Sequence, residues 1–511
     1  MNARMTGRKS IAGALAIAGL LLLTPAAGAG EIEVIFTEVP GHPTAQVPGA
    51  VDENGDPVDT EFKSMEILSV SPDGGQWILK GRNWLGSELE TMLLLGAGTE
   101  GAVFAQEGQP VHDGQPAEVY DFFGSSPPNF NELGQFIYTA RARDGDPATR
   151  HKGIFFDGTD FIMVREMSDP ALGLVDLPPG DSGDELFGNS FNSVHLLNDG
   201  SFGSHDPTIQ NIHSSRRPAV FYKDTAFLQT GISPVGDSIW DDMAMNTFWT
   251  TPDGTRWILE GKDAGAENQD LILVVDDVVV LREGSAIPGS GIILADIFHT
   301  KLIASGDWFC RGDDPADNDW AVRSGALLAA TGDPVVAGEA ELWTHAFYSF
   351  TGNRNGDWVL AGTTDNPDIQ VDSVIALNGE EVVVREGDPV DLDGNGMFDD
   401  DAFIGRGDAA LDAFRPDDIF LTDDGMLYFF CSLRNAAGED LGSFGTGGDA
   451  FLRLAVGAEC PADFDGDGDV DTADLLHLLA CWGTDCGDVD GDGDTDTADL
   501  LALLAAWGEC P

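Results

Sequence analysis

The segment Pro72-Asp73-Gly74-Gly75-Gln76-Trp77-Ile78-Leu79 combines a tight turn, an aromatic residue and a short apolar strand. Six further segments repeat this order of turn, aromatic or apolar anchor, and strand. They are NELGQFIY at 131–138, NDGSF at 198–202, PDGTRWIL at 252–259, SGDWF at 305–309, NGDWVL at 355–360 and DDGMLYF at 423–429. Successive anchors lie 50 to 69 residues apart, a period that predicts a repeat architecture.

A second pattern follows most of these copies. It consists of an apolar strand, a polar turn and another strand that ends in Arg-Glu or Glu-Gly, as in LILVVDDVVVLREG at 271–284 and VIALNGEEVVVREG at 374–387. One sheet of about four short strands cannot bury both of its faces alone, so it must stack on similar neighbours. The sequence therefore predicts a mainly β fold, with a seven-bladed β-propeller over residues 30–457.

The two ends of the repeat region predict how the ring of blades closes. The seventh copy has no strand of the Arg-Glu type after residues 451–456, whereas EIEVIFTEVPG at 31–41 resembles such a strand. We expect this N-terminal strand to complete the last blade, because closure removes an exposed sheet edge.

An Arg-Glu pair recurs in three blades, as Arg165-Glu166, Arg282-Glu283 and Arg385-Glu386. We interpret these pairs as structural turns or ion pairs, because a catalytic site would not recur in three blades.

The composition excludes some classes of partner. The chain has 511 residues with 88 Asp plus Glu and 26 Lys plus Arg, a formal charge of −62. Such a charge repels a phosphate backbone and an anionic membrane surface, so nucleic acid is not an expected partner. The acidity indicates either a solvated surface or carboxylates gathered to hold cations.

The N-terminus has the pattern of a secretory signal peptide over residues 1–29. Arg4, Arg8 and Lys9 precede an apolar run at 11–23, and small residues with Ala27 and Ala29 follow it. The run is shorter than the roughly 20 residues that a membrane-spanning helix needs. We therefore expect a secreted protein, extracellular or at the cell surface, with no membrane span.

The last fifty or so residues contain a near-identical duplication. ADFDGDGDVDTADLLHLLACWG at 462–483 is followed 25 residues later by GDVDGDGDTDTADLLALLAAWG at 487–508. Aspartates occupy positions 1, 3, 5, 7, 9 and 12 of a calcium-binding loop in each copy, with glycine at position 6. The predicted metal ligands are Asp463, Asp465, Asp467, Asp469, Asp471 and Asp474 in the first loop, and Asp488, Asp490, Asp492, Asp494, Asp496 and Asp499 in the second.

The charge of this segment favours a bound metal ion. Residues 458–511 contain 13 Asp and 2 Glu but no Lys or Arg, and a charge of −15 would keep the segment unfolded without cations. Ca²⁺ is the expected ion because it accepts six to eight oxygen ligands. The sequence predicts two Ca²⁺ sites here.

One amphipathic helix follows each loop, and no helical pattern precedes either loop. A duplicated loop with a single helix and Asp at position 12 resembles a type I dockerin rather than an EF-hand sensor. The resemblance implies an attachment module over residues 458–511 that binds a cohesin-like protein through loop positions 10 and 11, here Thr472, Ala473, Thr497 and Ala498. The cysteines and the absence of basic residues on the helices depart from cellulosomal dockerins, and the alternative is a calcium-stabilised tail without a partner.

A third loop with calcium-binding spacing lies in the repeat region. Asp391, Asp393, Asn395 and Asp399 match loop positions 1, 3, 5 and 9, and Gly396 matches position 6. Ala402 stands at position 12, so the bidentate ligand is missing unless Asp400 or Asp401 replaces it. The sequence therefore indicates a possible further Ca²⁺ site.

Four of the six cysteines lie in the C-terminal segment, and export permits disulfides there. Cys460, Cys481, Cys486 and Cys510 allow three pairings, of which we favour Cys460 with Cys510 and Cys481 with Cys486. Cys310 and Cys431 fall in equivalent strands of blades that are not neighbours. They are therefore expected to be buried thiols, because a disulfide needs Cα atoms within about 7 Å.

The sequence SPDGGQW at 71–77 is similar to turns of exported propellers of the translocation-protein B and WD-like repeat type, and more loosely to the Asp-box of sialidases. The Asp-box has one more residue before its Trp, so these residues are interpreted as a β-turn and a core aromatic.

The chain contains no G-x-S-x-G, H-E-x-x-H or P-loop motif. We expect a non-catalytic binding or structural propeller; the alternative is a polysaccharide-active hydrolase or lyase, because dockerins usually accompany carbohydrate enzymes.

Overall fold

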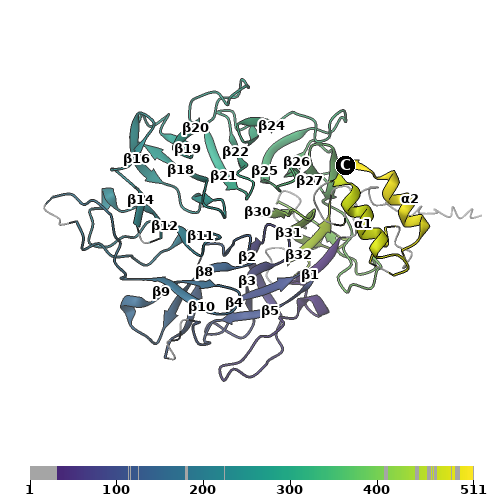
Figure 1. Cartoon of the computed structure of the whole chain (residues 1–511), viewed down its shortest axis with the longest axis horizontal. Coiled ribbons are helices and arrows are strands. Elements are labelled where there is room, and N and C mark those ends of the chain that lie inside the picture. The colour runs from purple at the N-terminus through teal and green to yellow at the C-terminus, as the bar shows by residue number, and fades with distance from the viewer. Residues whose placement is uncertain are drawn as a thin grey trace, which may run out of the picture.

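The structure is a computed structural model that describes residues 32–112, 114, 117–124, 126–178, 182–223, 225–407, 412–442, 448–456, 462, 464, 469–484, 486–489 and 495–509. In this part of the chain, seven antiparallel sheets stand around a common centre as the blades of a propeller (Figure 1). The predicted seven-bladed β-propeller is confirmed.

The first four blades follow one another along the chain. Blade 1 contains β2 (Phe62–Val70), β3 (Trp77–Asn83), β4 (Thr91–Ala97) and β5 (Glu100–Gln106). Blade 2 contains β6 (Val119–Phe123), β7 (Asn129–Phe130), β8 (Phe136–Arg143), β9 (His151–Phe156) and β10 (Phe161–Glu166). Blade 3 contains β11 (Asn192–Leu196), β12 (Phe202–Asp206), β13 (Ala219–Tyr222) and β14 (Thr225–Gln229). Blade 4 contains β15 (Pro234–Val235), β16 (Ser238–Met243), β17 (Trp249–Thr250), β18 (Trp257–Asp263), β19 (Leu271–Val275) and β20 (Val278–Arg282).

The remaining three blades complete the ring. Blade 5 contains β21 (Asp296–Leu302), β22 (Trp308–Asp313), β23 (Asp319–Arg323) and β24 (Ala326–Ala330). Blade 6 contains β25 (Trp343–Gly352), β26 (Trp358–Thr364), β27 (Ser373–Leu377) and β28 (Glu381–Arg385). Blade 7 contains β29 (Phe403–Ile404), β30 (Phe414–Leu421), β31 (Met426–Arg434) and β32 (Gly448–Ala455). Short 3-10 turns occur at η1 (Pro43–Ala45), η2 (Pro147–Thr149) and η3 (Ser214–Arg216).

The N-terminal strand closes the ring, as the sequence predicts. β1 (Glu33–Thr37) pairs antiparallel with β32 and forms the outer strand of blade 7. Its Phe36 packs against Trp77 of blade 1 and so joins the first blade to the last. Closure therefore uses both backbone hydrogen bonds and aromatic packing.

The repeated anchors lie at the start of the second strand of every blade. Trp77, Phe136, Phe202, Trp257, Trp308 and Trp358 are the first residues of β3, β8, β12, β18, β22 and β26, and Leu427 is the second residue of β31. The turn before each anchor folds back onto itself; in blade 1, for example, the Ser71 backbone N–H donates to the Gln76 carbonyl. The turn residues and anchors are therefore structural.

The arginines of the repeated Arg-Glu pairs form ion pairs at the ends of outer strands. Arg282 and Arg385 lie 2.7 and 2.8 Å from carboxylate oxygens of Asp263 and Glu341. Arg165 is buried and pairs at 3.0 Å with Asp206 of the next blade. The structural interpretation of these repeats is confirmed.

Two short helices follow the propeller, α1 (Thr472–Ala480) and α2 (Thr497–Ala505), drawn in yellow in Figure 1. They pack on a small core of Ala462, Val470, Leu478 and Leu503, and β33 (Asp469–Val470) pairs with β34 (Gly508–Glu509). Among the described residues, no helix has the length and hydrophobicity that a bilayer crossing requires.

Candidate functional site

The centre of the propeller encloses a cavity of about 330 Å³ that residues from all seven blades line. In every blade the anchor pairs with one residue of the innermost strand, for instance Trp77 with Val70. The residue immediately before that partner points to the opposite side, because successive side chains of a strand alternate. We call these seven residues the channel ring: Ser69, Asn129, His195, Trp249, Lys301, Thr351 and Phe420.

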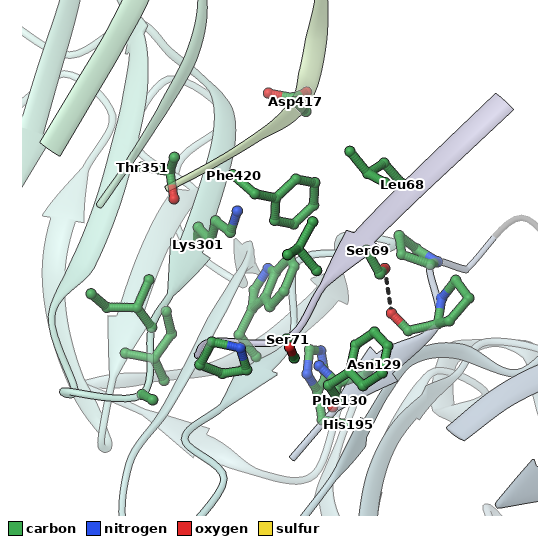
Figure 2. Close-up of a pocket in the computed structure, with 18 of the residues that line it drawn as sticks. Leu68, Ser69, Ser71, Asn129, Phe130, His195, Lys301, Thr351, Asp417 and Phe420 are labelled. Carbon is green, nitrogen blue, oxygen red and sulfur yellow. Dashed lines mark hydrogen bonds between the residues drawn. The ribbon is translucent and has the colours of Figure 1, made fainter. Parts of the chain in front are cut away.

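All seven members of the channel ring line the central cavity. Figure 2 shows six of them, with Ser69, Lys301, Thr351 and Phe420 around one space. The anchors repeat from blade to blade, whereas no two ring residues are identical. A position that varies within a repeated scaffold is where a specific site can be built, since the fold does not dictate its side chain.

Lys301 is the one cationic residue of the channel ring, and 8% of it is exposed. Its ammonium lies 3.8 Å from the centre of the Phe420 ring, a cation–π contact. Burial lowers the pKa of Lys301 to about 8, against the attraction of Asp417 and Asp418, which favours the charged form. The ammonium therefore stays mainly charged at neutral pH in a poorly hydrated place.

An acidic group from blade 7 lies near one end of the cavity. Asp417 Oδ1 is 3.0 Å from Nδ1 of His299 and 2.9 Å from Nη2 of Arg311, both in blade 5. Asp417 has a φ of 66°, in the left-handed region that non-glycine residues rarely adopt. The pairing of β30 with β31 shifts between Phe414 and Ile419, and this irregularity directs the Asp417 carboxylate toward blade 5.

A salt bridge connects two turns that do not belong to neighbouring blades. Arg354, in the turn after β25, lies 2.7 Å from Glu132 in the turn after β7 and 2.7 Å from Asp423 in the turn after β30. Arg354 and Asp423 also line the central cavity. This network therefore lies at the turn end of the channel and joins blades 2, 6 and 7.

The third predicted calcium loop brings carboxylates together. Oxygen atoms of Asp391, Asp393 and Asp400 lie within 4.8 Å of one another, a group that could hold a metal ion. Asp391 accepts hydrogen bonds from the backbone N–H groups of Gly394 and Gly396, at 2.9 and 2.6 Å. Asn395 accepts a hydrogen bond from the Met397 N–H at 2.8 Å, and Asp399 is not part of the carboxylate group. The residue that joins the triad is Asp400, one of the two substitutes considered for position 12.

The C-terminal loops lie partly outside the described residues, which exclude Asp463, Asp465, Asp467, Asp490, Asp492 and Asp494. In the described part, Asp471 caps α1 and Asp496 caps α2, each accepting from the N–H two residues ahead. Asp474 and Asp499 are completely buried and accept from Phe464 N and Val489 N, both at 2.7 Å. Asp469 lies in β33 and Asp488 precedes the undescribed part of the second loop. The two halves therefore use the same arrangement twice.

The partner-binding residues implied by the dockerin resemblance lie at the starts of the helices. The four residues at these positions, Thr472, Ala473, Thr497 and Ala498, are all exposed.

A disulfide joins Cys481 and Cys486, the pair assigned to the turn between the two halves. Cys460 and Cys510 lie outside the described residues. Cys310 and Cys431 are buried thiols in β22 and β31, the equivalent strands predicted for them.

The channel ring was not found by sequence reasoning, although a positional signal exists. Each ring residue precedes the anchor of its blade by seven or eight positions. Because the turn length varies among copies, the offset is not constant, and only the strand register aligns the seven positions. Residues of such mixed chemistry do not form a recognisable motif.

Buried acids elsewhere in the blades make stability depend on pH. Burial raises the pKa of Glu260 to about 8, and it raises those of Asp418 and Glu386 to about 7. Between pH 6.5 and 8 the folded protein therefore binds more protons than the unfolded chain, whose acids titrate near 4. The contribution of these three acids to stability falls as the pH rises through this window.

We predict that Glu260→Gln flattens this decline by about 1 kcal/mol per pH unit, because one pKa unit corresponds to about 1.4 kcal/mol. The measurement is denaturant unfolding of both proteins from pH 6.5 to 8. Burial lowers the pKa values of His195, His205 and His299 to about 4, so their titration near 6.5 in the unfolded chain opposes the decline at the lower end of the window. This contribution is the same in both proteins and cancels in the comparison. Parallel pH profiles for the two proteins would contradict this explanation.

Comparison with known proteins assigns neither a family nor an activity to this chain. No protein-family model matches the chain, and no curated protein matches it. The propeller domain of the Trilobed protease from Pyrococcus furiosus is 11% identical over 65% of this chain and 88% of that chain, with a TM-score of 0.37. An oligogalacturonate lyase in complex with manganese is 11% identical over 78% of each chain, with a TM-score of 0.28.

A longer protein shows the same kind of similarity. Prolyl oligopeptidase B from Galerina marginata is 10% identical over 76% of this chain, with a TM-score of 0.34. The chain covers 48% of that protein, so it spans about half its length. At these identities and scores, the comparisons support no inference about chemistry.

Proposed function

We propose that this chain is an exported calcium-binding protein whose C-terminal segment is a dockerin-like attachment module and whose propeller is a non-catalytic binding domain. The observation that carries the proposal is the duplicated unit in which Asp474 and Asp499 are completely buried. The segment 458–511 contains no Lys or Arg. Burying carboxylates without a cation is costly, so an added positive ion would stabilise this arrangement.

The donors of the described loop residues fit Ca²⁺. Asp471, Asp474, Asp488, Asp496 and Asp499 offer only carboxylate oxygens, which are hard ligands that Ca²⁺ prefers. The Asp391, Asp393 and Asp400 group has the same chemistry, and we assign it to Ca²⁺ as well. A bound Ca²⁺ would neutralise these carboxylates and hold each loop against its helix.

Both helices expose apolar side chains at equivalent positions. Leu476 and Leu479 on α1, and Trp482 two residues after its end, are 62%, 49% and 46% exposed. Leu501, Leu504 and Trp507 on the second unit are 63%, 49% and 47% exposed. Near-equal exposure shows that the two halves present the same surface twice. A cohesin-like protein is the proposed partner, and either half could bind it.

We predict that Leu476→Asp or Leu501→Asp alone leaves binding to an immobilised cohesin largely intact, because the other half replaces the altered one. The double variant is expected to lose binding by at least about 100-fold, since both apolar surfaces then carry a charge that would be buried in the interface. Surface plasmon resonance with a panel of cohesin modules in calcium measures this.

The matched control is Leu133→Asp, an exposed leucine (63%) in a propeller turn, which should bind as the unaltered chain does. Retention of binding by the double variant would exclude the helical surfaces as the attachment site. Failure of every cohesin to bind would leave the calcium-stabilised tail without a partner as the better description.

The channel favours binding over hydrolysis. Asp417 Oδ1 is engaged by both His299 and Arg311, and Asp418 lies 3.2 Å from both Arg415 Nε and the Leu68 N–H. Glycoside hydrolysis needs one carboxylate that attacks or activates water and another that donates a proton. Carboxylates held in ion pairs and backbone hydrogen bonds serve better to shape and charge the cavity, and we therefore assign the propeller a binding role.

A further inference from the structure

We propose that the central cavity binds a small hydroxylated organic acid whose carboxylate pairs with Lys301. This inference rests on the propeller being a binding domain and deepens that part of the proposed function. It does not depend on the attachment module. The geometry of the channel ring and the polar atoms beside it carry the inference.

The Lys301 ammonium makes a cation–π contact on one side, and the Lys301 side chain lines the central cavity. The ammonium lies over the Phe420 ring, and no hydrogen bond or ion pair connects it to any other residue in the described part of the chain. Asp417 and Asp418 on β30 attract the ammonium, but Asp417 is already within 3.0 Å of two groups of blade 5, and Asp418 lies 3.2 Å from Arg415. Figure 2 shows the ammonium of Lys301 in the space between Thr351 and Phe420. A buried cation without an anion is costly, so the cavity is suited to receive one.

Further polar groups line the same cavity without partners. The Ser126 and Ser193 hydroxyls and the Trp249 indole N–H are buried, and none has a hydrogen-bond partner among the described residues. An indole N–H can only donate, and a hydroxyl can donate or accept. Buried polar groups normally have partners. A ligand with several oxygen atoms would supply them.

The size and walls of the cavity limit the ligand. A volume of about 330 Å³ is at the low end for small-molecule pockets, which fits a ligand no larger than a monosaccharide. Leu68, Phe130 and Leu302 add apolar wall between the polar groups. A hydroxylated acid with a compact carbon skeleton matches this combination, whereas a polyanion would find only one cation in the ring.

The net charge of −62 opposes an anionic ligand only at a distance. At physiological ionic strength, charges beyond about 8 Å are largely screened, so the groups that line the cavity determine the potential that a bound carboxylate experiences, and Lys301 is the cation of the channel ring among them. Weak affinity is expected, since one ion pair and a few hydrogen bonds hold the ligand.

Glucuronate and glucose provide a matched pair of probes. They differ only in the carboxylate that replaces a hydroxymethyl group. Isothermal titration of the full chain at pH 7 is expected to show glucuronate binding and at least tenfold weaker glucose binding. Lys301→Met should reduce glucuronate binding at least tenfold without lowering the melting temperature, because it removes a buried charge and keeps the side-chain length. Lys223→Met, at a side chain 66% exposed in blade 3, is the control and should bind glucuronate normally.

The pH dependence of binding gives a second readout. Glucuronate affinity should fall as the pH rises through about 8, where Lys301 loses its proton. Other titratable or charged groups line the same cavity: Glu66 on β2, His195 on β11, His299 on β21, Asp417 and Asp418 on β30, and Arg354 and Asp423 at the turns. The histidines are neutral near pH 8, since burial lowers their pKa values to about 4. Asp418 has a pKa of about 7, so it gains a negative charge as the pH rises through 7, and this charge would weaken the binding of an anion.

Equal affinity for glucuronate and glucose, unchanged binding by Lys301→Met, or no binding of glucuronate would each overturn the proposal. The Leu476→Asp, Leu501→Asp double variant separates it from the attachment function. That variant should bind glucuronate as the unaltered chain does. Loss of cohesin binding with retained glucuronate binding, or the reverse, shows which of the two inferences fails.

Discussion

Removal of calcium by a chelator is expected to unfold α1 and α2 completely while the propeller remains folded. The module buries only a small core around Leu478 and Leu503, too little to offset 15 acidic side chains in residues 458–511. The free energy of metal binding therefore becomes the folding free energy of this segment. Circular dichroism should lose its helical signal in chelator and regain it with Ca²⁺.

Calorimetry on the full chain counts the sites. We expect three Ca²⁺ ions for the unaltered chain and two for Asp391→Ala, which removes the carboxylate that organises the propeller loop. The double variant Asp474→Asn, Asp499→Asn should bind one Ca²⁺ ion, at the propeller site. Because the disulfide between Cys481 and Cys486 persists in chelator, helices that survive there must be tested again after reduction. Full helix content without metal under both conditions would refute the calcium dependence.

Replacement of Trp77 by alanine is expected to cost about 3–5 kcal/mol of stability, the range for a large aromatic side chain in a core. The Trp77 side chain is completely buried and packs edge-on against Phe36 and Phe451 of the closing blade. Its indole N–H donates to the Gly98 carbonyl at 2.9 Å. Gly96 and Gly101 leave space for the ring, since a Cβ at either position would lie within 2.3 Å of it. Removal of the Trp77 ring therefore leaves a cavity in the core, which adds to the loss of stability.

Denaturant unfolding measures this loss, and limited proteolysis should show that β1 is released first, because Phe36 loses one of its two aromatic partners in blade 1, Phe62 being the other. Trp84→Ala is the matched control. Trp84 lies in the same blade and is 49% exposed, so its removal should cost less than about 1 kcal/mol. Equal losses for the two variants would mean that Trp77 does not hold the closing blade.

The fold could be predicted because its determinants are local and repeated. Each copy places a turn, an anchor and an apolar strand within about eight residues, and seven copies reinforce one interpretation. The closing strand was predictable for the same reason, since residues 31–41 resemble the outer strands elsewhere. The predicted calcium loops rest on local spacing too, and Asp400, which joins Asp391 and Asp393 in a group that could hold a metal ion, was among the residues considered.

The channel ring could not be predicted because its members are brought together only by closure of the ring. Ser69 and Phe420 lie on the first and last blades, and the register of seven separate hairpins brings them to one level. The pairing of Asp417 with His299 depends on an irregular strand, and the Arg354 to Glu132 bridge joins turns more than two hundred residues apart. None of these contacts has a signature in local sequence.

The amino-acid sequence by itself determined the number of blades, the closing strand, the anchors and the spacing of the proposed calcium ligands, since turns, strand alternation and ligand spacing act over a few residues. Only the tertiary structure decided which side chains face the channel, that Lys301 stands over Phe420, and which carboxylates are buried. The reason is physical: burial and electrostatic environment arise from packing between blades, and no single segment contains its own surroundings.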